Sequence, residues 1–403
     1  MILPREETLR ELPPPWADDL LPAIRRELQA GAQTLIVLDD DPTGTQTVYD
    51  LPVLTQWSVE VLRAELARGT PVFYVLTNSR SLPARAAAEL NRTIGQNIAT
   101  AARRAGQAVA VVSRSDSTLR GHFPVETDAL AHGLGQRFDG LLLIPYFLEG
   151  GRLTIDDVHY VAEEDKLIPA GQTPFAADAS FGYSASNLRA WVAEKTSGQI
   201  PADTVISITL DDLRRGGPDR VASRLQAVTG GAVCVVNATC QRDMEVLVLG
   251  LLRAEAAGKR FLYRTAASFV QTRAGLASRP LLTAAELALP AGGGLIVVGS
   301  YVPKSSGQLT HLLENTAIQA VEVDVAALLA EDAAMAGEVA RARQAVQTHL
   351  AKGQDVVLYT SRSLITGRDA EASLAIGKTI STSLVQIVRG LTVRPRYLLA
   401  KGG

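Results

Sequence analysis

The hydrophobic positions of this chain form short runs that alternate with longer stretches of helical spacing. Strand-length apolar runs occur at residues 34–38, 72–76, 108–112, 141–144, 204–208 and 232–236. Between them, residues 84–105 and 218–228 carry apolar side chains at intervals of three and four, which is the spacing of one helix face. This alternation predicts repeated βαβ units around a mostly parallel sheet that helices cover on both faces.

A second series of the same kind follows a Pro/Gly cluster at residues 289–294, which is a linker signal. Its expected strands are 295–298, 320–323 and 355–359, and its expected helices are 305–314, 333–351 and 371–388. A chain of 403 residues also exceeds the usual size of one domain. We therefore predict an α/β fold of two domains, 1–285 and 286–403, each a largely parallel sheet covered by helices.

One long stretch, residues 145–183, shows no clear periodicity and is rich in Gly, Asp and Pro. Irregular segments of this length inside a compact domain are usually functional loops or insertions. We expect the same of this one.

Composition narrows the classes of function. Lys and Arg number 40 against 42 Asp and Glu, so the net charge of −2 offers no basic stripe for nucleic acid. No apolar run approaches the roughly 20 residues that span a bilayer, so no membrane role is expected. Two cysteines and a charged start of the chain favour a reduced, cytoplasmic setting. The five histidines and the pair Cys234 and Cys240 lack metal-ligand spacing, so no protein-held metal is predicted.

Polar side chains follow the first expected strands, at the sheet edge where open parallel sheets bind ligands. Asp39, Asp40 and Asp41 come directly after the first strand. Adjacent carboxylates repel one another unless something compensates them, which makes one of them a candidate general base. The alternative is that they cap the following helix in water.

Four arginines, Arg80, Arg114, Arg120 and Arg152, also stand just after expected strands. The planar guanidinium suits a carboxylate or phosphate, so their shared placement predicts an anionic ligand. Each one alone would more often be a surface salt bridge.

Four motifs in this region resemble those of the four-carbon acid sugar kinases. The run at 40–44 resembles that family's Asp-Asp-x-Thr-Gly signature, and the run at 116–121 matches its Asp-Ser-Thr-Leu-Arg-Gly segment without a substitution. Ser-Arg at 79–80 and Gly-Gly-Arg at 150–152 follow the family's order. The resemblance implies a kinase that uses ATP and Mg²⁺ to phosphorylate a small-molecule sugar acid such as threonate, erythronate or 3-oxo-tetronate.

The resemblance also implies roles for residues. It makes Asp40 or Asp41 the base that activates the attacking hydroxyl, without choosing between them. The residues that it places around the carboxylate and hydroxyls of the substrate are Ser79, Arg80, Arg114, Asp116, Ser117, Arg120 and Arg152.

In the second domain, Gly299 and Ser300 follow a strand and lead into a helix, whose N-terminal N–H groups suit a phosphate. A plain strand-to-helix turn is the alternative. The resemblance favours the nucleotide site and adds the glycine-rich segment Lys401, Gly402 and Gly403. It also implies that the family's domain continues beyond this point, so we expect weak ATP binding by this chain and an unpaired sheet edge that favours self-association.

Two other functions fit parts of the sequence. The run 39–43 also fits the Asp-x-Asp-x-Thr motif of haloacid-dehalogenase-type phosphatases, in which Asp39 would be the nucleophile and Asp41 the acid/base, around magnesium. That function leaves the segment 116–121 unexplained. A non-catalytic sugar-acid-binding protein is the third hypothesis.

Overall fold

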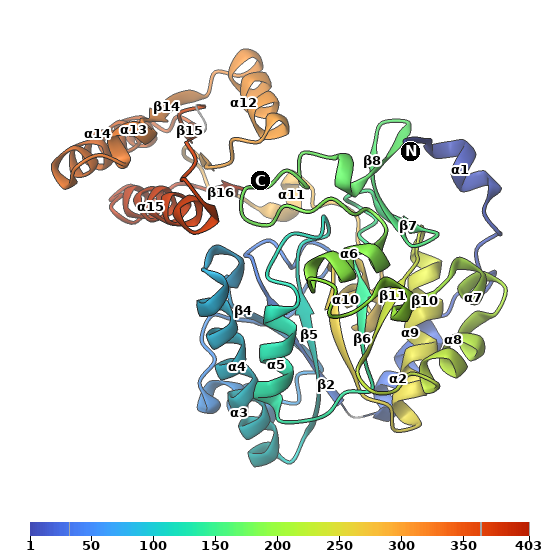
Figure 1. Cartoon of the computed structure of the whole chain (residues 1–403). Helices are drawn as coiled ribbons and strands as arrows, with labels where there is room; N and C mark the ends of the chain where they lie inside the picture. Colours follow the sequence, from blue (N-terminus) through green and yellow to red (C-terminus); the bar gives the residue numbers. More distant parts are fainter. Residues whose placement is uncertain (32, 363–364, 403) are drawn as a thin grey trace. The chain divides into compact units, whose positions relative to one another are not determined.

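The computed structural model describes residues 1–31, 33–362 and 365–402. Its contacts divide the chain into two compact units, Met1–Ser278 and Arg279–Gly403. The sequence placed the boundary near residue 285. Both units contain a parallel sheet with helices packed against it, so the predicted α/β class is confirmed (Figure 1).

The first unit is built on an eight-stranded sheet in the order β10-β11-β6-β12-β5-β2-β4-β3, with every neighbouring pair parallel. The strands are β2 (Gln33–Asp39), β3 (Val53–Leu54), β4 (Val72–Leu76), β5 (Ala108–Arg114), β6 (Gly140–Ile144), β10 (Ile206–Ile208), β11 (Ala232–Val236) and β12 (Phe261–Thr265). Strand β12 lies at the centre of the sheet and has no counterpart among the strands expected from the sequence.

Helices cover both faces of this sheet (Figure 1). Alternate residues of β2 point to opposite faces: Leu35 and Val37 belong to the core under α2 and α9, whereas Ile36 and Leu38 belong to the core under α3, α4 and α5. The helices of the unit are α1 (Arg5–Glu11), α2 (Leu21–Gly31), α3 (Val59–Ala67), α4 (Ala84–Ala105), α5 (Val125–Leu134), α6 (Leu188–Lys195), α7 (Leu210–Arg214), α8 (Gly217–Gln226), α9 (Gln241–Ala256) and α10 (Ala267–Arg273).

A separate antiparallel sheet occupies residues 152–169 of the stretch that showed no periodicity. Strands β7 (Arg152–Ile155), β8 (Val158–Glu163) and β9 (Lys166–Pro169) form consecutive hairpins, and β1 (Leu3–Pro4) pairs with the outer edge of β9. The expectation of a long irregular segment was therefore wrong for these residues. The strands are short, and His159, the second residue of β8, is a fully buried polar residue that obscures the alternation of apolar and polar positions.

The second unit has a four-stranded parallel sheet in the order β14-β15-β13-β16. Its strands are β13 (Leu295–Val298), β14 (Gln319–Val323), β15 (Val356–Thr360) and β16 (Leu398–Lys401). Its helices are α11 (Ala284–Leu287), α12 (Pro303–Asn315), α13 (Val325–Leu328), α14 (Asp332–Ala351) and α15 (Ala370–Arg389). Helices α14 and α15 share one core with the sheet, and α12 packs on a smaller core with Val298 and Val357.

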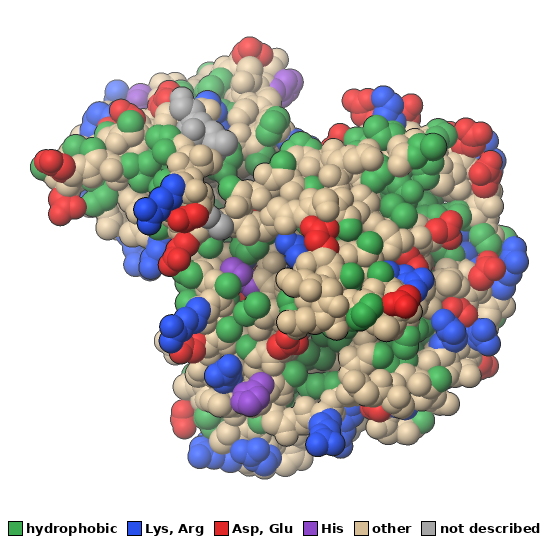
Figure 2. All heavy atoms as spheres, viewed as in Figure 1, with side chains coloured by type: hydrophobic (Ala, Val, Ile, Leu, Met, Phe, Trp, Pro, Cys, Tyr) green, Lys and Arg blue, Asp and Glu red, His purple; other side chains and the backbone are tan. Residues whose placement is uncertain are grey.

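Charged side chains of both signs are interspersed on the face of the first unit drawn in Figure 2. Within the described ranges, no helix has the length and apolar character needed to cross a membrane.

Candidate functional site

The carboxyl ends of four adjacent strands, β12, β5, β2 and β4, bring the predicted polar residues of the first unit together. The backbone links them directly. The amide of Asp40 donates to the carbonyl of Arg114 (3.2 Å), and the amide of Arg80 donates to the carbonyl of Asp40 (3.1 Å). Residues that are far apart in sequence therefore share one polar cluster, as expected at this edge of a parallel sheet.

Asp40 is buried and its carboxylate is fully engaged. Arg80 donates to both oxygens, from Nε to Oδ2 (3.1 Å) and from Nη2 to Oδ1 (2.5 Å). Ser115 Oγ adds a hydrogen bond to Oδ2 at 2.8 Å. A bidentate guanidinium and a hydroxyl compensate this charge and fix its position.

Asp41 is the most accessible of the three carboxylates, with 20% of its side chain exposed against 4% for Asp39 and Asp40. Arg80 Nη2 lies 2.6 Å from its Oδ2, and both the amide and the hydroxyl of Thr43 donate to its Oδ1. Partial burial opposes ionisation, but Arg80 and the Thr43 hydrogen bonds outweigh it and lower the pKa of Asp41. Asp41 is therefore a carboxylate at neutral pH.

Asp39 behaves in the opposite way. Burial raises its pKa to about 8, Arg114 at 3.5 Å offsets part of this effect, and the neighbouring carboxylates add to it. The side chain lies against Gly44, where a Cβ atom would come within 1.8 Å of Oδ2. Glycine at this position of the first motif is thus required to admit the Asp39 carboxyl group.

The segment 116–121, which we call the anion loop, follows β5. Arg120 Nε donates to Asp116 Oδ2 at 2.8 Å, and Arg80 lies 3.9 Å from the other oxygen. Asp116 is also an acceptor for the Thr118 hydroxyl. Although burial opposes ionisation, the two guanidiniums hold the pKa of Asp116 well below its usual range.

Arg152, at the start of β7, stands beside Arg120. Both guanidiniums lie over the ring of Phe175, at 5.1 Å for Arg120 and 5.4 Å for Arg152 from the ring centroid. Among the described residues, no carboxylate forms an ion pair with Arg152, and its buried Nε has no hydrogen-bond partner. Burial lowers the pKa of Arg152. An unpaired, half-buried guanidinium of this kind suits an anionic ligand.

The other predicted substrate residues lie in the same cluster. Ser79 is buried after β4, where its hydroxyl is 3.0 Å from that of Thr77. Arg114 Nη1 lies 3.5 Å from Oδ1 of Asp39 and 3.9 Å from Oδ1 of Asp41. Ser117 contributes its carbonyl to a hydrogen bond with His159.

Two members of the cluster were not found from the sequence. Arg264, near the end of β12, is 4% exposed and donates to Ser115 Oγ (3.3 Å) and to the carbonyl of Arg120 (3.0 Å). Glu126 on α5 is buried nearby, and burial, with a further contribution from Asp40, raises its pKa to about 7. The apolar run Phe261–Tyr263 followed by Arg264 has the same strand-then-arginine pattern as β5 and could have indicated the first of them.

The second unit holds a separate polar group at the carboxyl ends of β13 and β16. Lys401 Nζ donates to Ser305 Oγ at 3.0 Å and to the carbonyl of Gly402, and burial and then Lys304 lower its pKa. Ser300 Oγ is buried without a hydrogen-bond partner in the part of the chain that the structure describes. Gly299 N lies 3.4 Å from the carbonyl of Lys401. Gly403 lies outside the described residues.

Helix α12 begins beside this group, at Pro303. Its N-cap residue, Val302, has no side chain able to bond the first amides of the helix. Open helix amides, a lysine and an unpartnered hydroxyl together fit a phosphate group. The predicted residues Gly299, Ser300, Lys401 and Gly402 are therefore brought together.

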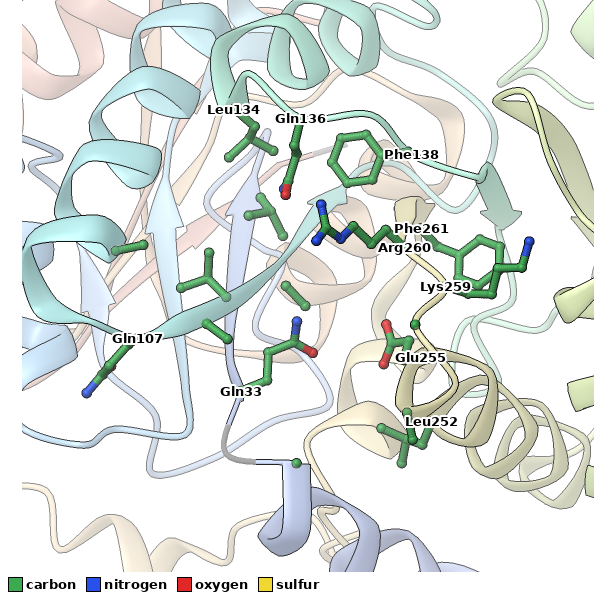
Figure 3. Close-up of a pocket in the computed structure, with 18 of the residues that line it drawn as sticks. Gln33, Gln107, Leu134, Gln136, Phe138, Leu252, Glu255, Lys259, Arg260 and Phe261 are labelled. Carbon is green, nitrogen blue, oxygen red and sulfur yellow. The ribbon is translucent and has the colours of Figure 1, made fainter.

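A cavity of about 820 Å³ lies at the opposite edge of the large sheet, below the amino ends of β2, β5 and β12 (Figure 3). Gln33, Gln136, Glu255 and Arg260 line it. It contains none of the motif residues, so it is distinct from the cluster described above. Within the described ranges, no group of three or more His, Cys, Asp or Glu side chains is arranged to hold a metal ion.

Comparisons with known proteins agree with this division of the chain. A family described as "Sugar-binding N-terminal domain" matches residues 35–273, and one described as "Nucleotide-binding C-terminal domain" matches residues 295–403. A search among curated proteins found no match.

Several solved structures are similar to this chain at low sequence identity. A Salmonella typhimurium LT2 protein is 17% identical with a TM-score of 0.55, over 88% of this chain and 80% of its own. Haemophilus influenzae protein HI1011, of family DUF1537, is 18% identical with a TM-score of 0.50, over 91% and 86%. A Bordetella bronchiseptica DUF1537 protein, solved with bound citrate as a domain-swapped dimer, is 21% identical with a TM-score of 0.46, over 92% and 83%.

Proposed function

Because this chain belongs to the DUF1537 family of four-carbon acid sugar kinases, which joins a sugar-binding to a nucleotide-binding domain, we propose that it transfers a phosphoryl group from ATP to a four-carbon sugar acid. The observation that carries the proposal is the unpaired guanidinium of Arg152 beside Arg120, in the same cluster as an ionised, accessible Asp41. The guanidiniums of Arg120 and Arg152 suit a carboxylate, and the carboxylate of Asp41 suits a hydroxyl. A sugar acid has both.

Asp41 is the better candidate for the base. Phosphoryl transfer needs a carboxylate that can accept the proton of the attacking hydroxyl, together with accurate positioning. Both oxygens of each carboxylate are engaged, but Asp41 is ionised and 20% exposed whereas Asp40 is only 4% exposed. We assign Asp40 to the fixing of Arg80, and Asp41 to the substrate hydroxyl.

In the reaction that follows from this assignment, the hydroxyl oxygen of the acid forms a bond to the γ-phosphorus of ATP. The bond from that phosphorus to the β,γ-bridging oxygen breaks, ADP leaves, and the hydroxyl proton passes to Asp41. Arg120 and Arg152 hold the substrate carboxylate, which fixes the hydroxyl relative to Asp41.

The phosphates of ATP are assigned to the group in the second unit. Lys401, the buried Ser300 hydroxyl and the open amides at the start of α12 offer positive charge and donors to them. Magnesium bound with ATP supplies neutralisation of phosphate charge.

The phosphatase alternative is less consistent with the site. Its nucleophile would be Asp39, which must be ionised and accessible to attack a phosphoester. Asp39 is buried, and its pKa of about 8 keeps it protonated at neutral pH. The hypothesis of a non-catalytic sugar-acid-binding protein is distinguished from the kinase by a measurement of activity.

The test is a panel of threonates, erythronates and 3-oxo-tetronates incubated with the full chain and magnesium-ATP, with ADP as the readout. We expect ADP release that depends on one of the acids, and none with the matching four-carbon polyols. Binding of an acid without ADP release would favour the non-catalytic protein. Phosphate release from a tetronate phosphate without ATP would favour the phosphatase.

A further inference from the structure

Side chains of the antiparallel sheet and of the segment that follows it contact the backbone of the anion loop. His159 Nε2 lies 2.7 Å from the carbonyl oxygen of Ser117, and Tyr183 Oη donates to the carbonyl of Thr118 at 2.6 Å. These two carbonyls are consecutive in the motif at 116–121. Residues from 152–183, which we call the insert, therefore fix the backbone of the loop that carries Asp116 and Arg120.

The hydrogen bonds of His159 define its state. A carbonyl only accepts, so Nε2 must carry the proton and Nδ1 must accept from the hydroxyl of Thr154, 2.9 Å away. His159 is fully buried, and burial lowers its pKa to about 4. At neutral pH it is thus a neutral imidazole in a single tautomer, which acts as a fixed donor.

A second contact of the insert is made through Phe175. Its ring carries the guanidiniums of both Arg120 and Arg152, which is favourable because cations are attracted to aromatic faces. The two guanidiniums repel each other, and the positive charge of Arg120 contributes to lowering the pKa of Arg152. Arg120 is also held by Asp116 and, at 3.7 Å, by Asp178 of the insert.

The Phe175 ring is a contact that Arg152 shares with Arg120, and the charge of Asp116 also attracts Arg152. Within the described residues, the guanidinium of Arg152 forms no ion pair, and its one hydrogen bond is to the carbonyl of Gly150 in its own turn. The ring therefore offsets the repulsion and holds two guanidiniums ready for one anion.

We propose that the insert is the positioning element of the acid site, with His159, Tyr183 and Phe175 as positioning residues that set the affinity for a carboxylate. The identity of the ligand as a sugar acid rests on the proposed function. The positioning role does not, because it concerns binding and needs no turnover.

The experiment is calorimetric titration of the full chain with threonates and erythronates, with the corresponding polyols as ligands lacking the carboxylate, and separately with magnesium-ATP. We expect Phe175→Leu to weaken acid binding at least tenfold and Phe175→Trp to retain most of it, since tryptophan keeps an aromatic face. Phe138→Leu is the matched control, because Phe138 is similarly half-buried but lies at the opposite edge of the sheet.

Two substitutions of His159 test whether its N–H donor to the carbonyl of Ser117 is needed. His159→Leu should weaken acid binding at least tenfold, whereas His159→Gln, which retains an N–H donor, should recover part of the loss. Tyr183→Phe removes a single hydroxyl and provides a milder variant if His159→Leu does not fold. ATP affinity should stay unchanged in all of them, which a general loss of structure would not allow.

The outcomes separate this inference from the proposed function. Acid binding within twofold of wild type in Phe175→Leu and Tyr183→Phe would overturn the positioning role even if the protein is a kinase. A wild-type protein that binds none of the acids would overturn it too. Weakened acid binding in the variants, in a protein that never forms ADP, would support the positioning role and refute the kinase.

Discussion

A single nitrogen of Arg80 connects two of the three consecutive carboxylates: Nη2 lies 2.5 Å from Oδ1 of Asp40 and 2.6 Å from Oδ2 of Asp41. The guanidinium of Arg80 thus lies between the buried carboxylate of Asp40 and the more accessible carboxylate of Asp41. Asp40 and Asp41 are adjacent in sequence and share this contact, but they differ in exposure, and we propose different chemical roles for them.

The first prediction follows from that difference. Asp41→Asn should lower turnover by about a hundredfold or more, because the amide cannot accept the proton, while acid binding and folding change little. Asp40→Asn should lower stability instead, because it removes the charge that Arg80 and Ser115 bond. Steady-state kinetics and urea unfolding of both variants distinguish the roles. Near-normal turnover of Asp41→Asn would exclude it as the base.

The second prediction concerns Arg80. Arg80→Lys keeps the charge but loses the two-pronged contact with Asp40, so we expect a loss of stability of about 1 to 3 kcal/mol from the buried carboxylate left partly unpaired. Arg104→Lys is the control, since its contact with Glu60 at 3.9 Å is well exposed and should be worth little. Equal unfolding free energies of the two variants would show that the Arg80 fork is dispensable.

Parts of this site could be predicted from the sequence because strands that are close in the sequence are also neighbours in the sheet. Asp41 and Arg80 each follow an apolar run, and adjacent parallel strands carry both to one edge. Arg264 escaped notice because its strand, β12, was not identified and enters the centre of the sheet from far along the chain. No local sequence pattern specifies that β12 lies between β6 and β5 in the sheet.

The insert was harder to predict for a different reason. Its buried polar side chains find partners inside the fold, as His159 does in the carbonyl of Ser117 and the hydroxyl of Thr154 does in His159. A buried histidine or threonine breaks the period-two pattern that identifies a half-buried strand. The role of Asp39 likewise depended on burial, which raises its pKa and which three adjacent aspartates do not reveal by themselves.

The third prediction concerns the nucleotide group of the second unit. Lys401→Met should weaken magnesium-ATP binding about tenfold or more, since a charged hydrogen bond contributes roughly 1.5 to 3 kcal/mol, and should leave binding of the acid unchanged. Lys378→Met, at an exposed position of α15, is the control. An unaltered ATP affinity in Lys401→Met would remove this lysine from the site.

The last prediction uses the pH dependence of stability. The pKa of Asp39 rises from an ordinary value of 3.8 to about 8 on folding, so between these values the folded state binds more protons than the unfolded state. Stability must then fall as pH rises through this window, by at most about 1.4 kcal/mol per pH unit for one group. Glu126, with a pKa raised to about 7, adds a slope of the same sign over a narrower window.

Asp39→Asn cannot ionise, so this variant should lose the Asp39 share of the slope and keep that of Glu126. We expect its unfolding free energy to exceed that of wild type at pH 8.5 and to approach it near pH 5, where the Asp39 carboxyl is already neutral in the folded protein. Asp116 has a lowered pKa, so its effect on stability changes only below about pH 4, outside the range from pH 5 to 8.5. Urea unfolding at pH 5, 7 and 8.5 makes the measurement, with Asp203→Asn at an exposed position as control. Parallel pH profiles for wild type and Asp39→Asn would mean that Asp39 is ionised in the folded protein, which would also restore it as a candidate nucleophile.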